Sequence, residues 1–169
     1  MTKKIHISIL INGIFILTVL LFVLDGWTAF EIKSPVIKSF TYLGIIILAP
    51  PTLIWNMRRL ESGKWKALSS ILPVGVLVTI LIIGPLKIAS ASSAWRTQTI
   101  VYESGHLDFR KVEFQMQDVG ALGYNKRTVE VIYLTDWFMI VGPVEEGIEE
   151  RVEWTRVDKD INELGLKFP

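Results

Sequence analysis

The first half of the chain contains three long apolar stretches, and each has the length that a helix needs to cross a membrane. A helix crosses the hydrocarbon layer of a bilayer with about 20 residues. The stretches run over residues 5–24, about 36–56 and about 70–87, and the first carries no formal charge. The sequence therefore predicts an integral membrane protein with three transmembrane helices.

A cleaved signal peptide is the alternative interpretation of the first stretch, because Lys3 and Lys4 give it a basic start. The apolar run is longer than the core of a typical signal peptide. It is followed by Asp25-Gly26-Trp27 and not by a small-x-small cleavage site. We therefore expect an uncleaved anchor.

Prolines interrupt the second stretch, and a Gly-Pro pair interrupts the third. Pro50 and Pro51 lack a backbone N–H and obstruct the carbonyls four residues earlier. Residues 36–49 alone would be too short to cross, so a kinked helix is expected there and not a terminated one. Gly84 and Pro85 should bend or loosen the far end of the third helix.

Basic residues are unevenly divided between the two ends of the predicted helices. One side has six of them in short segments: Lys3, Lys4, Arg58, Arg59, Lys64 and Lys66. The other side has four: Lys33, Lys38, Lys87 and Arg96. The positive-inside rule then places the N-terminus and the 58–66 loop in the cytoplasm. The C-terminal part is expected outside the cell (inner) membrane, and Lys38 is expected to reach the headgroups from its helix end.

Four tryptophans lie at the predicted ends of the spans. Trp27 and Trp95 flank the outer ends, and Trp55 and Trp65 flank the inner ends. Tryptophan is enriched where a membrane meets water, so these four residues are predicted membrane-interface anchors. Their positions support the span boundaries and an odd number of spans.

The balance of charge divides the chain into two predicted domains. Residues 1–93 carry nine basic and three acidic residues, and residues 94–169 carry nine basic and fourteen acidic residues. The first region is the helical domain, and the second is a small extramembrane domain. An acidic domain lacks the basic surface that nucleic-acid binding requires. Cysteine is absent, which excludes disulfides, thiol nucleophiles and thiolate metal sites.

In the C-terminal domain, apolar and polar residues alternate as they do in short strands. Five are predicted, over residues 96–103, 106–117, 128–134, 137–141 and 151–157. The second changes parity, which predicts a bulge near Arg110-Lys111. Asp158 is expected to cap a short helix over 159–164 that Gly165 closes. The predicted fold is thus a helical membrane domain followed by an α+β domain of mainly antiparallel strands.

No motif for catalysis, metal binding or nucleotide binding stands out. His6 and His106 are the two histidines, and the predicted topology places them on opposite sides of the membrane. Gly120 and Gly123 are too close together for a dinucleotide fingerprint. The carboxylates of the C-terminal domain show no spacing that singles out an acid–base pair. We therefore expect no catalytic residue, no metal ligand and no cofactor.

Two segments of the C-terminal domain are candidate partner contacts. One is Trp137, Phe138 and Met139, because aromatic and Met side chains are common interface anchors; alternating burial in a strand is the competing interpretation. The other is an acidic stretch that can attract a basic surface or a divalent cation, with a solvated loop as the competing interpretation. It consists of Glu145, Glu146, Glu149 and Glu150.

These features favour a non-enzymatic role. No span has a charge near its centre, which disfavours an ion-coupled transporter, and Asn12 is expected to hydrogen-bond a neighbouring helix. The hypothesis is a membrane protein that presents a β-rich domain to a protein partner, as an accessory subunit or, by analogy of size and layout, as an immunity-type protein. The alternative is a homo-oligomeric membrane pore or effector gated by the C-terminal domain.

Overall fold

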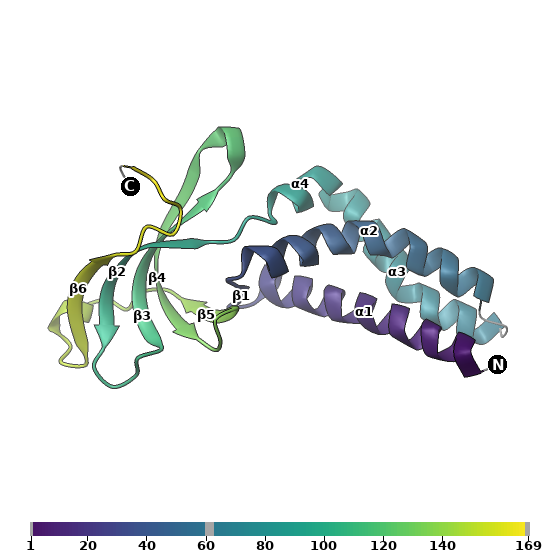
Figure 1. Cartoon of the computed structure of the whole chain (residues 1–169), viewed down its shortest axis with the longest axis horizontal. Coiled ribbons are helices and arrows are strands. Elements are labelled where there is room, and N and C mark those ends of the chain that lie inside the picture. The colour runs from purple at the N-terminus through teal and green to yellow at the C-terminus, as the bar shows by residue number, and fades with distance from the viewer. Residues whose placement is uncertain (1, 60–62, 168–169) are drawn as a thin grey trace. The chain divides into compact units, whose positions relative to one another are not determined.

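The computed structural model describes residues 2–59 and 63–167, with side chains from residue 6 onward (Figure 1). Its helices are α1 (Thr2–Trp27), α2 (Pro35–Arg59), α3 (Gly63–Ile83) and α4 (Pro85–Ser90). Its strands are β1 (Phe30–Ile32), β2 (Arg96–Ser104), β3 (Arg110–Asp118), β4 (Tyr124–Tyr133), β5 (Phe138–Gly142) and β6 (Trp154–Asp160). Two short 3₁₀ helices are η1 (Gly120–Leu122) and η2 (Ile148–Glu150).

The chain divides into two compact units. The helical unit comprises Met1–Val23 and Ser39–Ser92, and the sheet unit comprises Leu24–Lys38 and Ser93–Pro169. The sheet unit therefore includes the end of α1, the whole of β1 and the start of α2. Sequence reasoning had assigned all of residues 1–93 to the helical domain.

Three helices among the described residues, α1, α2 and α3, are long and apolar enough to cross a membrane. Together with α4 they form a core that consists of Phe15, Phe22, Tyr42, Ile45, Ala49, Val76, Ile80 and Ile88. The outer surface is also apolar: Leu81 and Ile82 on α3 are each 79% exposed, and Ile47 on α2 is 66% exposed. A surface of this kind is costly in water and suits a lipid environment.

The α2 helix continues through Pro50 and Pro51 to Arg59, as predicted. The α3 helix starts at Gly63, seven residues before the predicted start at residue 70. Arg58 and Arg59 therefore end α2, and Lys64 and Lys66 belong to the first turn of α3, so the predicted 58–66 loop is wrong in extent. Within it, Leu60, Glu61 and Ser62 lie outside the described residues.

Pro73 lies inside α3, where it leaves the carbonyl of Ser69 without an intrahelical donor. The amide of Asn56 on α2 donates a 2.9 Å hydrogen bond to that carbonyl. Asn56 also exchanges two 3.0 Å hydrogen bonds with the amide of Asn12 on α1. The prediction that Asn12 bonds a neighbouring helix is confirmed, and one polar cluster links all three helices.

Gly84 separates α3 from α4. Its φ of 93° lies in a region that residues with a Cβ rarely adopt, and Pro85 starts the next helix at its first position. The predicted disruption at Gly84 and Pro85 is therefore a break between two helices.

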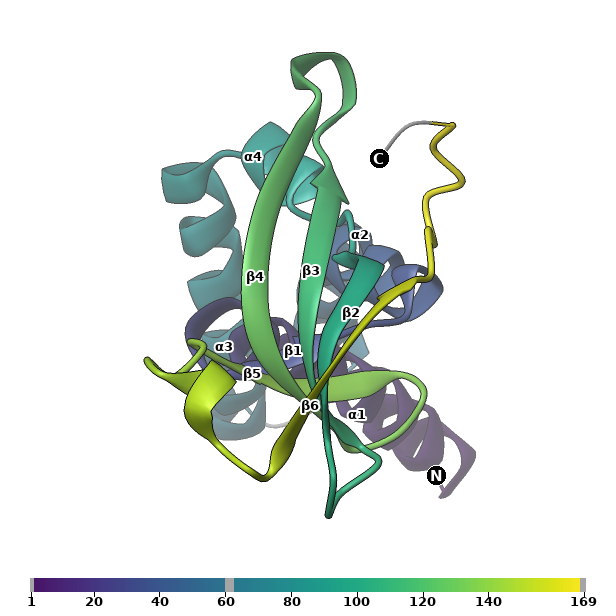
Figure 2. The same cartoon turned by 90° about the vertical axis from the view of Figure 1, so that its left-hand side faces the viewer.

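The six strands form one antiparallel sheet in the order β1-β5-β4-β3-β2-β6. Figure 2 shows β4, β3, β2 and β6 in sequence across the sheet and the long hairpin of β3 and β4, which extends past the neighbouring strands. The β1 strand, which was not predicted, comes from the connection between α1 and α2 and pairs with β5: Phe30 faces Ile140, and Ile32 faces Phe138.

One prediction about the strands is wrong. The β3 strand pairs with β4 in unbroken register from Arg110 to Asp118, so no bulge interrupts that pairing near Arg110-Lys111. The parity change arises because the strand starts at Arg110, after a turn over residues 108–109. The irregularities lie on β2, between Thr97 and Thr99 and between Ile100 and Tyr102.

The predicted helix over 159–164 is also wrong. The β6 strand continues to Asp160, and the chain then runs beside β2, where Ile161 and Asn162 donate to the carbonyl of Gln98 and Glu163 donates to that of Thr97. Partners on β2 satisfy these backbone groups, so pairing overrides the local helix signal.

Lys38 does not extend toward headgroups as predicted. Its side chain is 6% exposed, and its ammonium lies 3.1 Å from the carboxylate of Asp25. Asp25 also accepts a 2.6 Å hydrogen bond from the backbone of Ile32. The start of α2, the end of α1 and β1 are thus joined through one carboxylate.

Candidate functional site

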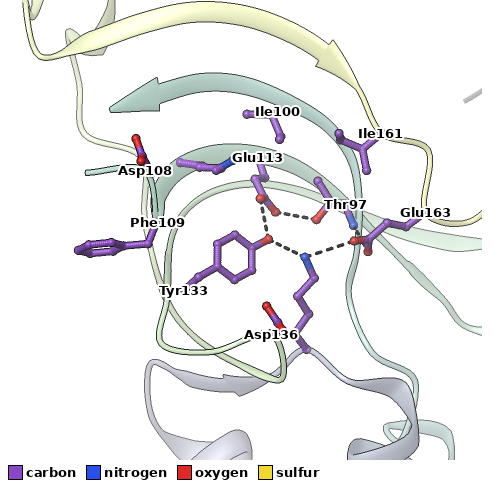
Figure 3. A pocket seen from close by; sticks show the side chains of 11 residues that line it. Thr97, Ile100, Asp108, Phe109, Glu113, Tyr133, Asp136, Ile161 and Glu163 are labelled. Carbon is purple, nitrogen blue, oxygen red and sulfur yellow. Dashed lines mark hydrogen bonds and ion pairs between the residues drawn. The ribbon is translucent and has the colours of Figure 1, made fainter. Parts of the chain in front are cut away.

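The sheet unit contains a cavity of about 610 Å³ that is lined by eight polar or charged residues and three apolar ones (Figure 3). Its walls come from the connection after β1, from β2, β3 and β4, from two turns, and from the segment after β6. The lining residues are Lys33, Thr97, Ile100, Asp108, Phe109, Lys111, Glu113, Tyr133, Asp136, Ile161 and Glu163. A cavity of this size falls within the range of small-molecule sites.

Glu113 on β3 is the most deeply buried charged group of the cavity, with 1% of its surface exposed. Its carboxylate accepts hydrogen bonds from the hydroxyls of Thr97 and Tyr133, both at 2.7 Å, and from the amide of Gln115 at 3.0 Å. Burial of a carboxylate is costly unless such donors replace water. Three donors offset that cost here.

Lys33 supplies one of the two cations that line the cavity. Its ammonium donates to the Tyr133 hydroxyl at 2.7 Å and lies 3.2 Å from the carboxylate of Glu163. Burial and the charge of Glu113 raise the pKa of Tyr133, so its phenol stays protonated at neutral pH. The hydroxyl therefore accepts from Lys33 and donates to Glu113.

Arg127 on β4 extends this network to β1. Its guanidinium donates twice to the side-chain oxygen of Gln115, at 2.8 and 3.0 Å. It also forms a two-pronged ion pair with Glu31 at 2.6 and 2.7 Å, and it lies 4.0 Å from the centre of the Trp95 ring. One polar face of the sheet thus holds the α1–α2 connection in place.

Sequence reasoning missed this network. Its members are single polar residues on separate strands, and no two of them share a motif. The available signal was weak: Glu113 and Gln115 occupy alternate positions of a strand, where a buried face would ordinarily be apolar.

Four exposed apolar side chains lie in the turns after β2 and β4, the same turns that contribute Asp108, Phe109 and Asp136 to the cavity. These four, which we call the turn surface, are Leu107, Phe109, Leu134 and Trp137, with 40 to 58% of each side chain exposed. The backbone N–H of Tyr133 donates to the carbonyl of Phe109 at 2.9 Å, which holds the two turns together. Asp108 and Asp136, both exposed, come from the same two turns.

The structure separates the three residues of the first predicted contact. Trp137 is 58% exposed, whereas Met139 is 0% exposed. Phe138 is half-buried, and its ring stacks on Phe30 at 5.3 Å. Met139 therefore belongs to the core, because alternation in β5 turns it inward, and the available aromatic is Trp137.

The acidic stretch lies beyond the other end of β5 from Trp137, so the two predicted contacts are not brought together. Its four glutamates, Glu145, Glu146, Glu149 and Glu150, are all exposed. Glu145 forms an ion pair with Arg151, which reduces the charge that the stretch offers to a partner.

The four predicted interface tryptophans differ in their surroundings. Trp27 and Trp65 are more than half exposed. The indole N–H of Trp55 donates to the hydroxyl of Ser8 at 3.0 Å, and Trp95 lies under Arg127. The role of these residues at a membrane interface stays a prediction.

Among the residues that the structure describes, no group of three or more His, Cys, Asp or Glu side chains is placed to hold a metal ion. No protein-family model, curated protein or solved structure matches this chain.

Proposed function

We propose that this chain is a membrane-anchored, non-enzymatic binding protein. In this proposal α1, α2 and α3 cross the membrane, and the sheet unit contacts another protein through the turn surface. Two settings fit the role: an accessory subunit of a larger membrane assembly, and an immunity-type protein that neutralises a toxin at the membrane.

The pairing of β1 with β5 is the observation that carries the proposal. The β1 strand connects α1 to α2, and β5 belongs to the C-terminal region. Strands that share a sheet lie on the same side of a membrane, because a sheet edge cannot pair through hydrocarbon. Three crossings satisfy this condition, and the positive-inside rule favours the outer side for the sheet unit.

The arrangement of the polar groups supports binding over catalysis. Glu113, Tyr133 and Lys33 are each held by hydrogen bonds to one another or to Thr97, Gln115 and Glu163. A general base or nucleophile needs a free position toward a substrate. This network uses its polar atoms to stabilise the sheet.

The turn surface supports protein contact better than the sheet edges do. The β6 edge carries Arg156, Asp158, Lys159 and Asp160, and charged residues protect an edge from pairing with other strands. The β1 edge has only three residues. Exposed Trp137 and Phe109 are of the kind that anchors interfaces.

Site-specific photocrosslinking tests the proposal. In one variant of the full chain, a benzophenone amino acid replaces Trp137. In the control variant, the same amino acid replaces Val157 on β6. Both variants are produced in the native membrane of the source cell. We expect an adduct with one unlike protein from position 137 and none from position 157. Adducts that contain only two or more copies of this chain would instead favour the homo-oligomeric alternative. Equal labelling from both positions would refute the proposal.

A topology reporter tests the membrane arrangement separately. One half of the reporter is active only outside the inner membrane and the other only in the cytoplasm. We expect a fusion at the C-terminus to report outside and a fusion between α2 and α3 to report inside. A cytoplasmic C-terminus with an outer α2–α3 connection would invert the orientation, and the same side for both would contradict three crossings.

A further inference from the structure

We infer that the cavity of the sheet unit receives a basic side chain, Lys or Arg, of the partner protein, while the turn surface contacts an apolar residue beside it. The inference rests on the proposed function and narrows it to a partner segment of defined chemistry. Its basis is the volume of the cavity, the excess of carboxylates in its lining and the aromatic side chains beside it.

The charge of the cavity favours a cation. Among its lining residues, two cations, Lys33 and Lys111, face four carboxylates: Asp108, Glu113, Asp136 and Glu163. Lys33 pairs with Glu163, and Lys111 lies 3.0 Å from Glu103 outside the cavity. The lining therefore has an excess of negative charge that a positively charged group would neutralise.

Two of the carboxylates are available to such a group. Glu113 already accepts three hydrogen bonds. Asp108 and Asp136 line the cavity (Figure 3), are exposed, and have no hydrogen-bond or ion-pair partner among the described residues. Hydrogen bonds between a cation and a carboxylate are about twice as strong as neutral ones.

The aromatic side chains beside the cavity favour a cation that has an apolar neighbour. Phe109 lines the cavity and is 48% exposed, and Trp137 is 58% exposed in the adjoining turn. Aromatic faces attract ammonium and guanidinium groups and also bury apolar side chains. A volume of about 610 Å³ exceeds the needs of one side chain and leaves room for its neighbour.

Fluorine NMR on the full chain in detergent tests the inference. A 4-fluorophenylalanine at position 109 reports on the cavity. The probes are the capped dipeptides acetyl-Phe-Lys-amide and acetyl-Phe-Arg-amide, with acetyl-Phe-norleucine-amide as the uncharged match. We expect saturable shifts from the basic dipeptides, at least about tenfold tighter than from the norleucine dipeptide.

Two double variants show whether the carboxylates at the cavity are responsible. Asp108→Asn with Asp136→Asn should weaken binding of the lysine dipeptide about tenfold. Glu146→Gln with Glu149→Gln removes the same charge from the acidic stretch and should change binding by less than about twofold. All four substitutions are at exposed positions, and unchanged thermal midpoints would show that both variants fold.

Three results would overturn the inference: no saturable shift up to about 20 mM dipeptide, equal binding of the norleucine dipeptide, or equal weakening by both double variants. A shift produced by phosphatidylethanolamine in the micelle, with none from the dipeptides, would assign the cavity to a lipid amine instead. If position 137 crosslinks to a partner while the dipeptides fail, the proposed function stands and this inference falls.

Discussion

Arg127 and Glu31 are 96 residues apart in the sequence and join through two parallel hydrogen bonds of 2.7 and 2.6 Å. One residue lies on β4 of the C-terminal region and the other on β1, between the first two helices. The pair therefore fastens a helix connection into a sheet. Two-pronged pairing of this kind requires the planar guanidinium of arginine.

Arg127→Lys should destabilise the sheet unit by about 2 kcal/mol, because lysine keeps the charge but loses the second prong and the stacking on Trp95. The measurement is chemical denaturation of the purified chain in detergent, followed by tryptophan fluorescence. Arg156→Lys is the matched control. Arg156 pairs with Asp158 at the exposed surface, where solvent screens the two charges, so the change should leave the free energy of unfolding nearly unchanged. Equal losses of stability in the two variants would show that the ion pair with Glu31 contributes no more than the exposed pair with Asp158.

The stability of the sheet unit should fall at alkaline pH through Tyr133. The pKa of its phenol is raised above the ordinary value of 10.0 by burial and by the charge of Glu113. The unfolded chain releases this proton near pH 10 and the folded chain retains it, so the stabilisation is complete below pH 10 and is lost as the pH rises further. The parent chain should lose stability above pH 10 faster than Tyr133→Phe, by up to about 1 kcal/mol per pH unit.

Thermal midpoints of both chains between pH 8 and 11 would measure this effect, since the other titrating groups are common to the two. Parallel curves would contradict the assignment. At neutral pH, Tyr133→Phe should itself cost about 2 kcal/mol, because Glu113 loses one of its three donors.

Asn12 and Asn56 should be energetically coupled. Either residue changed to Leu removes both hydrogen bonds between the two amides, and each change should cost about 1 kcal/mol; the bond from Asn56 to Ser69 remains in Asn12→Leu. The double variant should cost less than the sum, because no amide is then left without that partner. Unfolding in mixed micelles with increasing dodecyl sulfate would measure these costs, and strict additivity would refute the coupling.

Gly84→Ala should destabilise the helical unit by about 1–3 kcal/mol through backbone strain alone. The φ of Gly84 is 93°, and a Cβ added there meets no atom within 4 Å. Gly75→Ala is the control inside α3, where space is equally open and φ is helical; it should be neutral or stabilise by up to about 1 kcal/mol. The same dodecyl sulfate titration compares the two. Equal effects of the two substitutions on stability would show that position 84 does not require a backbone conformation that favours glycine.

The three apolar helices could be predicted because a run of about 20 apolar residues is a local property of the chain. The strands of the C-terminal region were found for the same reason, since alternation along 5–10 residues is visible without knowledge of their partners. Their order in the sheet was not predicted, because it depends on which edges meet.

The failures share a different cause. The β1 strand has three residues and no period of its own, and it forms because β5 offers an edge. The segment after Asp158 has the marks of a capped helix, yet partners on β2 hold it extended. Lys38 was expected at the headgroups, and it is buried because Asp25 lies on the preceding helix.

The sequence by itself determined the number and places of the apolar helices and the strand-rich character of the C-terminal region. The tertiary structure alone decided that the α1–α2 connection belongs to the sheet, and that Lys33, Glu113, Tyr133 and Glu163 surround one cavity. The physical reason is that the local periodicity of apolar residues shows which environment, aqueous or apolar, each face of a helix or strand meets. Hydrogen bonds between single polar residues 66 to 100 positions apart exist only after the strands have paired.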